Sequence, residues 1–414
     1  MSSNSPWKTS NWFSSPWNFS PEARDDLTPP IALQVHDVTL RDGEQQSGVV
    51  FTADEKVRIA EALAEAGVHR IEAGLPAVSP ADEEAVRRIA ALGLPSKIYA
   101  FARCIVDDVK RARDCGVEGV VMEIPSSYHL IEEAYRWPRE KAIELSIEAT
   151  SIAHDEGLLV SFFPIDATRA GLTEYLDLIS RVAREGHVDA VGLVDTFGVL
   201  SPHAVRLFVR KTREALQVPL ETHFHMDFGM GVANTVLAVA AGAEVIQTTV
   251  TGIGERAGNT PMEETILALL TMYGIDAGIR TECFTSLSQL VMDIANVKQP
   301  SNRPVVGERL FEVESGIIAN WFRNVGDEKL TEIFPYRPEL VGQTAPRAVL
   351  GKGSGPDSVM MWLDRHSIVA SSEEIRQILE VVKKRSTEKK SLLDDDDVFK
   401  IVESIRSGST SQNR

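Results

Sequence analysis

PLETHFH (residues 219–225), VANTVLAVAAG (232–242) and EVIQTTVTG (244–252) together contain the pattern that decides the fold. They are a short apolar run, a longer run that ends at Gly242, and a second short apolar run. Short apolar runs bounded by turn residues are typical of buried strands, and a glycine just after a longer periodic run is typical of a helix end. The stretch therefore predicts a strand–helix–strand unit.

The same alternation of strand and helix occurs eight times from Ile31 onward. The expected strands are Ala32–Leu40, His69–Gly74, Lys97–Arg103, Gly119–Pro125, Leu158–Pro164, Ala190–Thr196, Pro219–His225 and Glu244–Gly252. The expected helices are Ala53–Gly67, Pro80–Gly93, Val106–Gly116, Glu140–Gly157, Leu172–Gly186, Pro202–Leu216, Val232–Gly242 and Pro261–Gly274. Eight such units in roughly 250 residues predict an α/β protein with a closed (β/α)8 TIM barrel. An open doubly wound sheet is the alternative, but it would not bring the first and seventh strands together.

The periodicity changes after about Ile275. We expect a TIM-barrel catalytic domain over residues 31–276 and a mostly helical C-terminal subdomain over residues 277–414. Residues 1–30 are rich in Ser, Asn, Pro and Trp, which predicts an extended N-terminal arm, with a flexible leader as the alternative. The tryptophans expected to pin this arm are Trp7, Trp12 and Trp17. The helices expected in the C-terminal subdomain are Ser286–Val297, Ser372–Lys383 and Asp394–Ile405.

The composition is that of an ordinary globular protein, with 43% hydrophobic and 25% charged residues in 414. A net charge of −17 argues against a nucleic-acid surface and against docking to an anionic membrane. Anionic substrates remain compatible with this charge, because a local cluster of arginine and metal dominates the field inside a pocket. Three cysteines outside any Cys-x-x-Cys pair favour a reducing compartment, and no apolar run reaches transmembrane length. The N-terminus lacks a signal pattern, so we expect a cytoplasmic protein.

Two histidines, His223 and His225, stand at positions i and i+2 of the seventh expected strand. Side chains two apart on a strand share a face, so both imidazoles can reach one ion while Phe224 points away. Asp42 offers an anionic oxygen and Asn259 a neutral one, and barrel closure brings all four to the C-terminal mouth. A bare His-x-His is more often structural, but here it closes a strand ahead of a Gly-rich segment. The mixed nitrogen and oxygen set suits Zn, Mn, Fe or Co and tolerates Mg.

Four motifs resemble those of one family: TLRDGEQ (39–45), HFHMDFG (223–229), VAN (232–234), and GIGERAGN (252–259) followed by Thr260-Pro261. The family comprises metal-dependent TIM barrels that make or break carbon–carbon bonds next to a carboxylate. It includes isopropylmalate, homocitrate and citramalate synthases and, more distantly, HMG-CoA lyase. The resemblance runs from about Ile31 to about Arg406. It implies a divalent metal (Mg, Mn or Zn), with acetyl-CoA or another acyl-CoA as cosubstrate.

The resemblance supports metal binding by the residues at matching positions, which are Asp42, His223, His225 and Asn259. Arg41 adjoins the metal aspartate and is the best candidate for stabilising enolate charge, and Glu72 is expected to orient it. The alternative for Glu72 is a salt bridge at the barrel mouth. Arg103 and Arg169 are candidates for bidentate binding of a substrate carboxylate. Thr196 is a further candidate, because the matching threonine of the family contacts the substrate carboxylate.

Several positions depart from the family pattern. Met226 stands where the synthases have Asn, and Ile165 stands where they have a Glu after strand five. Ile318 and Gly353 replace two C-terminal histidines, of which the first assists proton transfer in the synthases. Neither residue can accept or donate a side-chain proton. The remaining candidates for the proton acceptor are therefore Glu123, Asp166, Tyr128 and His129.

The leading hypothesis is a divergent condensing enzyme that joins an acyl-CoA to a 2-oxo acid. Its products would be a 2-hydroxy-2-alkyl dicarboxylate and free CoA, as in alkylmalate or homocitrate synthesis. The alternatives are a metal-dependent lyase, aldolase or decarboxylase acting on a 2-hydroxy or 2-oxo acid, and a non-catalytic paralogue. HMG-CoA lyase has a Cys in the loop before the metal Asn, and Thr251–Asn259 contains none. The resemblance also implies a homodimer; the motifs do not identify the 2-oxo acid.

Overall fold

The computed structural model describes residues 5–411 and divides the chain into two compact units. One unit runs from Ser15 to Gln299 and contains the barrel. The other unit combines the residues up to Ser14 with those from Pro300 onward. Within residues 5–411, none of the helices has the length and apolar character needed to cross a membrane.

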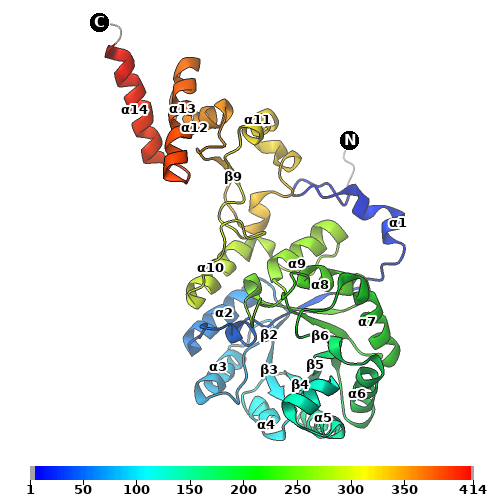
Figure 1. Cartoon of the computed structure of the whole chain (residues 1–414). Coiled ribbons are helices and arrows are strands. Elements are labelled where there is room, and N and C mark those ends of the chain that lie inside the picture. The colour runs from blue at the N-terminus through cyan, green and yellow to red at the C-terminus, as the bar shows by residue number, and fades with distance from the viewer. Residues whose placement is uncertain (1–4, 412–414) are drawn as a thin grey trace. The chain divides into compact units, whose positions relative to one another are not determined.

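Eight parallel strands close into a barrel in chain order, and β8 pairs with β1 to complete the circle. Figure 1 shows the helices arranged around this barrel. The predicted TIM barrel is therefore confirmed. The strands are β1 Gln34–Asp37, β2 Arg70–Glu72, β3 Lys97–Arg103, β4 Gly119–Pro125, β5 Leu159–Ile165, β6 Ala190–Asp195, β7 Leu220–Phe224 and β8 Val245–Thr248. The helices that follow them are α2 Ala53–Glu65, α3 Pro80–Ala91, α4 Val106–Asp114, α5 Arg139–Asp155, α6 Leu172–Glu185, α7 Pro202–Ala215, α8 Gly231–Ala240 and α9 Met262–Ala268.

Local sequence signals set the helix ends. The Thr52 hydroxyl accepts a hydrogen bond from the Glu55 amide at 3.3 Å, and the Glu55 carboxylate accepts one from the Thr52 amide at 2.7 Å. This reciprocal capping satisfies backbone groups that the first turn of α2 leaves without partners. Gly67 follows the end of α2 with φ +90°, a left-handed conformation that glycine adopts without a steric penalty.

Polar side chains fill part of the barrel interior. Ser161 on β5 donates a hydrogen bond to Glu221 on β7 at 2.8 Å, and Arg70 on β2 donates one to the same carboxylate at 2.7 Å. These strands are not neighbours in the barrel, so both contacts must cross its interior. Glu221 is fully buried, and a carboxylate is tolerated there because charged and polar donors surround it.

The unit from Ser15 to Gln299 also holds α1, Pro21–Arg24, and α10, Phe284–Ala295. The segment before β1 is tied to the barrel where the Thr28 amide donates to the Ala240 carbonyl at 2.8 Å. Because α10 packs against α2, the barrel unit extends beyond residue 276, to Gln299.

The second unit contains the short paired strands β9, Glu312–Val313, and β10, Arg347–Ala348. Its helices are α11 Gly316–Val325, α12 Pro356–Arg365, α13 Ser372–Lys389 and α14 Asp395–Ser411. Its core surrounds Trp362, whose indole donates a hydrogen bond to Asp395 at 2.8 Å. The N-terminal residues join this unit through a bridge between Trp12 and Tyr336.

Candidate metal centre

The turn after β1 places Arg41 and Asp42 at the barrel mouth. The Val38 carbonyl accepts hydrogen bonds from the amides of Arg41 (3.2 Å), Asp42 (2.9 Å) and Gly43 (3.1 Å). Three amides that converge on one carbonyl curl the chain tightly. The first strand, expected to continue to Leu40, consequently ends at Asp37. The two charged side chains that follow are buried at the C-terminal end of the barrel, where TIM-barrel sites are built.

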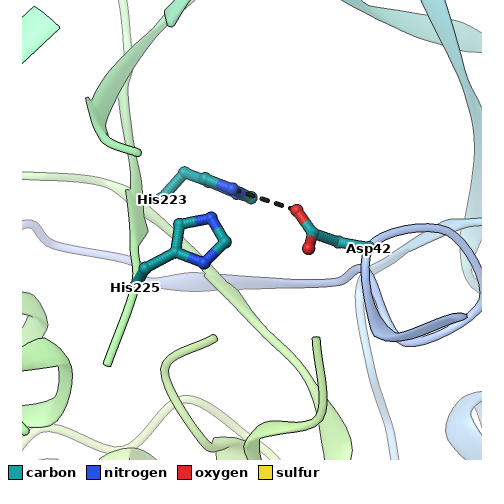
Figure 2. Close-up of side chains that lie close together, drawn as sticks. All are labelled: Asp42, His223 and His225. Carbon is teal, nitrogen blue, oxygen red and sulfur yellow. Dashed lines mark ion pairs between the residues drawn. The ribbon is translucent and has the colours of Figure 1, made fainter. Parts of the chain in front are cut away.

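Asp42, His223 and His225 form one buried cluster. Each offers one possible ligand atom, and these atoms all lie within 4.8 Å of one another. Figure 2 shows the His223 ring directed at the carboxylate of Asp42, and the His223 Nε2 to Asp42 Oδ2 distance is 3.2 Å. The two imidazole rings come from β7 and the residue that follows it, with ring centres 5.1 Å apart. The predicted convergence of these three side chains is therefore observed.

Asp42 and His225 have the protonation states that metal binding needs. Burial lowers the pKa of His225 to about 4, despite the opposing charge of Asp42, so the ring is neutral at pH 7. Burial opposes ionisation of Asp42, but the charge of Arg41 holds its pKa well below the usual value. The Nδ1 atom of His225 is buried and has no hydrogen-bond partner among the described residues. A buried imidazole nitrogen without a partner and a neighbouring carboxylate fit a divalent cation.

Asn259 lies against the same aspartate, since its Nδ2 donates to Asp42 Oδ1 at 2.8 Å. A backbone bridge between His225 and Asn259 holds the Gly-rich segment beside β7. Gly258 is required in this segment because a Cβ there would lie 1.9 Å from the Gly252 carbonyl oxygen, and its φ is +90°. The motif residues predicted as ligands thus lie together, with Asn259 in contact with Asp42.

A second set of contacts orients His223 from behind. His223 Nδ1 lies 2.8 Å from Gln247 Oε1, and Gln247 Nε2 donates to Glu221 Oε2 at 3.1 Å. All three residues are buried. Metal-binding histidines commonly use their second nitrogen in this way, which fixes the ring and its tautomer. The sequence motifs did not indicate Gln247 or Glu221, although both occupy inward positions on strands that bear or adjoin the histidines.

Arg41 is held between two carboxylates. Its Nε pairs with Glu72 on β2, and its Nη1 donates to Asp42 Oδ2 at 3.0 Å. The guanidinium carbon also lies 4.1 Å from the centre of the Phe101 ring. Glu72 therefore contacts Arg41 as expected. Arg41 lines the cavity, and Glu72 is not among the lining residues.

A cavity of about 220 Å³ opens at this mouth. Its lining residues are Arg41, Asp42, Gln45, Phe101, Glu123, Phe163, Ile165, Val194, Thr196, His223, His225 and Glu255. Thr196 is among the lining residues, and its hydroxyl accepts a hydrogen bond from the Asp166 amide at 2.7 Å. Arg103 and Arg169 are not among the lining residues. Arg103 pairs with Asp108 at 2.7 and 3.0 Å, and Arg169 pairs with Asp166 at 2.6 and 3.1 Å.

The four candidate proton acceptors have different surroundings. Asp166 is buried, and its carboxylate accepts hydrogen bonds from Ser127 and Arg169. The Nε2 atom of His129 lies 3.0 Å from the same carboxylate. The guanidinium carbon of Arg139 lies over the Tyr128 ring, 3.6 Å from its centre. Only Glu123 lines the cavity. Burial raises the pKa of Glu123 above its ordinary value, and Arg41 opposes this effect.

The chain is a TIM barrel, and the carboxylate and two imidazoles buried at its mouth form a group that could hold a metal ion. The family model described as HMGL-like matches residues 32–291. Homocitrate synthase AksA of Methanopyrus kandleri is 42% identical over 362 residues, which are 87% of this chain and 90% of that protein. The 2-isopropylmalate synthase of Methanocaldococcus jannaschii is 35% identical over 387 residues, which are 93% and 74% of the two chains.

The chain belongs to the HMGL-like family. Among solved structures, hydroxymethylglutaryl-CoA lyase from Pseudomonas aeruginosa is similar with a TM-score of 0.58 and 20% identity. The match covers 65% of this chain and 95% of the lyase chain. At this level of identity the likeness shows the shared barrel fold alone.

Proposed function

We propose that this protein is an acyl-CoA:2-oxo-acid condensing enzyme that forms a 2-hydroxy-2-alkyl dicarboxylate and free CoA. The observation that carries the proposal is the placement of Arg41 beside the Asp42, His223 and His225 cluster on one cavity. Relatives that cover most of the chain are named as synthases of this kind. A divalent ion held by the cluster would act as a Lewis acid toward the ketone of the 2-oxo acid.

The protein's own side chains supply the other requirements. Thr196 binds the carboxylate of the 2-oxo acid, and Asn259 completes the surroundings of Asp42. Arg41 stabilises the negative charge that develops on the thioester oxygen, because a preorganised cation in a dry site costs little reorganisation during the reaction. Glu72 holds Arg41 in place through the guanidinium Nε.

Glu123 is the proposed proton acceptor. Its carboxylate takes a proton from the methyl group of acetyl-CoA, and the electron pair of that C–H bond becomes the enolate. The enolate carbon then forms a bond to the ketone carbon, and the ketone oxygen takes up a proton and becomes the hydroxyl group. Water cleaves the thioester, which leaves the second carboxylate and CoA with a free thiol. Burial raises the pKa of Glu123, and a carboxylate with a raised pKa is a better proton acceptor for the first step.

Free-thiol release tests the proposal. With divalent metal present, CoA should appear only when acetyl-CoA and a 2-oxo acid are supplied together. Loss of a 2-hydroxy acid without any need for CoA would instead support the lyase or aldolase alternative. Binding of metal and 2-oxo acid with no turnover in either direction would make the protein a non-catalytic paralogue.

We also propose a cytoplasmic homodimer. Helix α11 exposes two large apolar side chains, Ile317 at 66% and Trp321 at 49%, which a second copy of the chain would cover. Light scattering of the purified protein should give twice the 45.5 kDa mass of one chain. A monomer at micromolar concentration would contradict this part of the proposal.

A further inference from the structure

One part of the cavity wall is apolar. It consists of Phe101, Phe163, Ile165 and Val194, which come from three strands. Phe101, Phe163 and Val194 belong to one buried cluster with Tyr99 and Val121, so this wall is a continuous part of the barrel core. The Phe163 ring meets the His223 ring edge-on, with centres 5.6 Å apart. Apolar surface therefore begins directly beside the metal ligands.

The charges on the cavity are mostly negative. Among the described residues that line it, Arg41 is the one cation, and Glu123 and Glu255 are carboxylates in addition to Asp42. The positive charge of Arg41 is already shared between Glu72 and Asp42. A second carboxylate on the substrate would therefore have no cation of its own in this cavity.

The other arginines near the mouth do not supply a cation for a second substrate carboxylate either. Arg103 pairs with Asp108, and Arg169 pairs with Asp166. Arg256 pairs with Asp227 at 2.8 and 3.0 Å and donates to the Thr196 carbonyl. Recruiting any of them to a ligand would leave a carboxylate without its partner, which is costly where that carboxylate is buried, as Asp166 is.

We infer that the 2-oxo acid is a monocarboxylate with a short, uncharged, apolar side chain, and that 2-oxo diacids are excluded. This inference rests on the proposed function. The 1-carboxylate and ketone occupy the metal and Thr196 side of the cavity, and the side chain contacts Phe101, Phe163 and Ile165. A buried charged group without a partner binds poorly, whereas a methyl or ethyl group gains from burial. The names of the relatives do not decide the point, because homocitrate and isopropylmalate synthases differ in product.

Binding and turnover together test the inference. Calorimetry on the full-length protein with Mn²⁺ should show that 2-oxobutyrate binds at least tenfold more tightly than 2-oxoglutarate. In the thiol-release assay with acetyl-CoA, pyruvate, 2-oxobutyrate or 2-oxoisovalerate should give kcat/KM at least a hundredfold above that of 2-oxoglutarate or oxaloacetate. Tighter binding and faster turnover of either diacid would overturn the inference. Selective binding of a monocarboxylate without CoA release would keep the substrate class and reject the proposed reaction.

A pair of variants at Ile165 tests whether this wall makes the selection. Ile165→Lys places a cation on the apolar wall, and Ile165→Met is a matched uncharged control. The ratio of the two dissociation constants should shift at least tenfold toward 2-oxoglutarate in Ile165→Lys and less than threefold in Ile165→Met. Equal ratios in both correctly folded variants would show that the substrate side chain lies elsewhere. If Ile165→Lys does not fold, the binding and turnover of the 2-oxo acids by the wild-type protein alone test the inference.

Discussion

Glu221 fixes the orientation of the Gln247 side chain, because the carboxylate can only accept and must face the Nε2 of Gln247, 3.1 Å away. Burial opposes ionisation of Glu221, but its contacts with His36 and with Arg70, the latter at 2.7 Å, lower its pKa to about 2. The Oε1 of Gln247 is then directed at His223 Nδ1, at 2.8 Å, and can only accept. His223 must therefore carry its proton on Nδ1, which leaves the Nε2 lone pair facing Asp42, where it could bind a metal ion.

Gln247→Leu should lower the affinity for Mn²⁺ by about 10–100-fold, the usual cost of losing a partner that orients a metal ligand. Calorimetry with the apoprotein gives the dissociation constant, and ¹⁵N chemical shifts of the histidines report the His223 tautomer. Thr222→Val is the matched control, because Thr222 is buried on β7 next to His223 and its hydroxyl has no hydrogen-bond partner among the described residues. An unchanged tautomer in Gln247→Leu would refute the orienting role.

His223→Ala and His225→Ala should each remove measurable turnover and weaken divalent-metal binding. Both imidazoles lie in the buried cluster with Asp42, and no other His, Cys, Asp or Glu among the described residues belongs to that cluster. Metal content after dialysis, measured by mass spectrometry, checks the binding. A double variant that retains full activity after treatment with a chelator would show that the metal centre is assigned to the wrong residues.

Arg41→Lys should reduce turnover by roughly tenfold or more with little change in fold. Lysine keeps the charge but cannot contact Glu72 and Asp42 through a planar fork. Steady-state kinetics and circular dichroism give the two readouts. Arg181→Lys, a change at a pair with Glu140 on the helical surface of the barrel, is the control and should leave kcat unchanged. Wild-type kcat in Arg41→Lys would reduce Arg41 to a structural ion-pair partner.

Glu123→Gln should lower kcat by about 100-fold or more, as expected for loss of a general base. In the wild type, kcat/KM should fall as the pH drops through the pKa of Glu123, because only the ionised carboxylate can accept a proton. Burial raises that pKa, so the midpoint of this acidic limb should lie above 4.5. A pH profile in Glu123→Gln with the same limb and the same kcat would assign the proton transfer to another group.

Asp37→Asn should change how stability depends on pH. Burial raises the pKa of Asp37 to about 7, with a smaller contribution from the charge of Glu72, and the Thr39 hydrogen bonds oppose the shift. The folded protein therefore binds more protons than the unfolded chain between about pH 4 and pH 7, and this carboxyl contributes less stability as the pH rises. Asparagine does not titrate, so the variant should gain stability relative to the wild type from pH 5 to pH 8. Urea denaturation at both values measures the difference, and a constant difference would contradict the assignment.

The barrel and the meeting of Asp42 with His223 and His225 were predictable from sequence. Eight alternating apolar runs define the strand order, and closure then places β1 and β7 at one mouth. The orienting pair Gln247 and Glu221 was not predictable in the same way. It depends on the register between β7 and β8 and on which side chains meet inside the barrel.

The ion pairs of the arginines near the strand ends were not predictable from sequence either. Arg103 and Arg169 follow strand ends, which made them candidates for substrate binding. Each has a carboxylate within five residues, Asp108 and Asp166, and pairs with it in the folded chain. Sequence spacing does not say whether a guanidinium prefers that local partner or a ligand, because the choice depends on backbone geometry at the strand end.

Product analysis tests the central claim most directly. The full-length protein, loaded with divalent metal, is incubated with acetyl-CoA labelled with ¹³C at both acetyl carbons and with unlabelled 2-oxobutyrate. The account predicts a 2-hydroxy dicarboxylate that contains both labelled carbons and the intact carbon skeleton of the 2-oxo acid, in amounts equal to the free CoA. Label recovered only as acetate or acetyl-CoA, with the 2-oxo acid unchanged or cleaved, would contradict it.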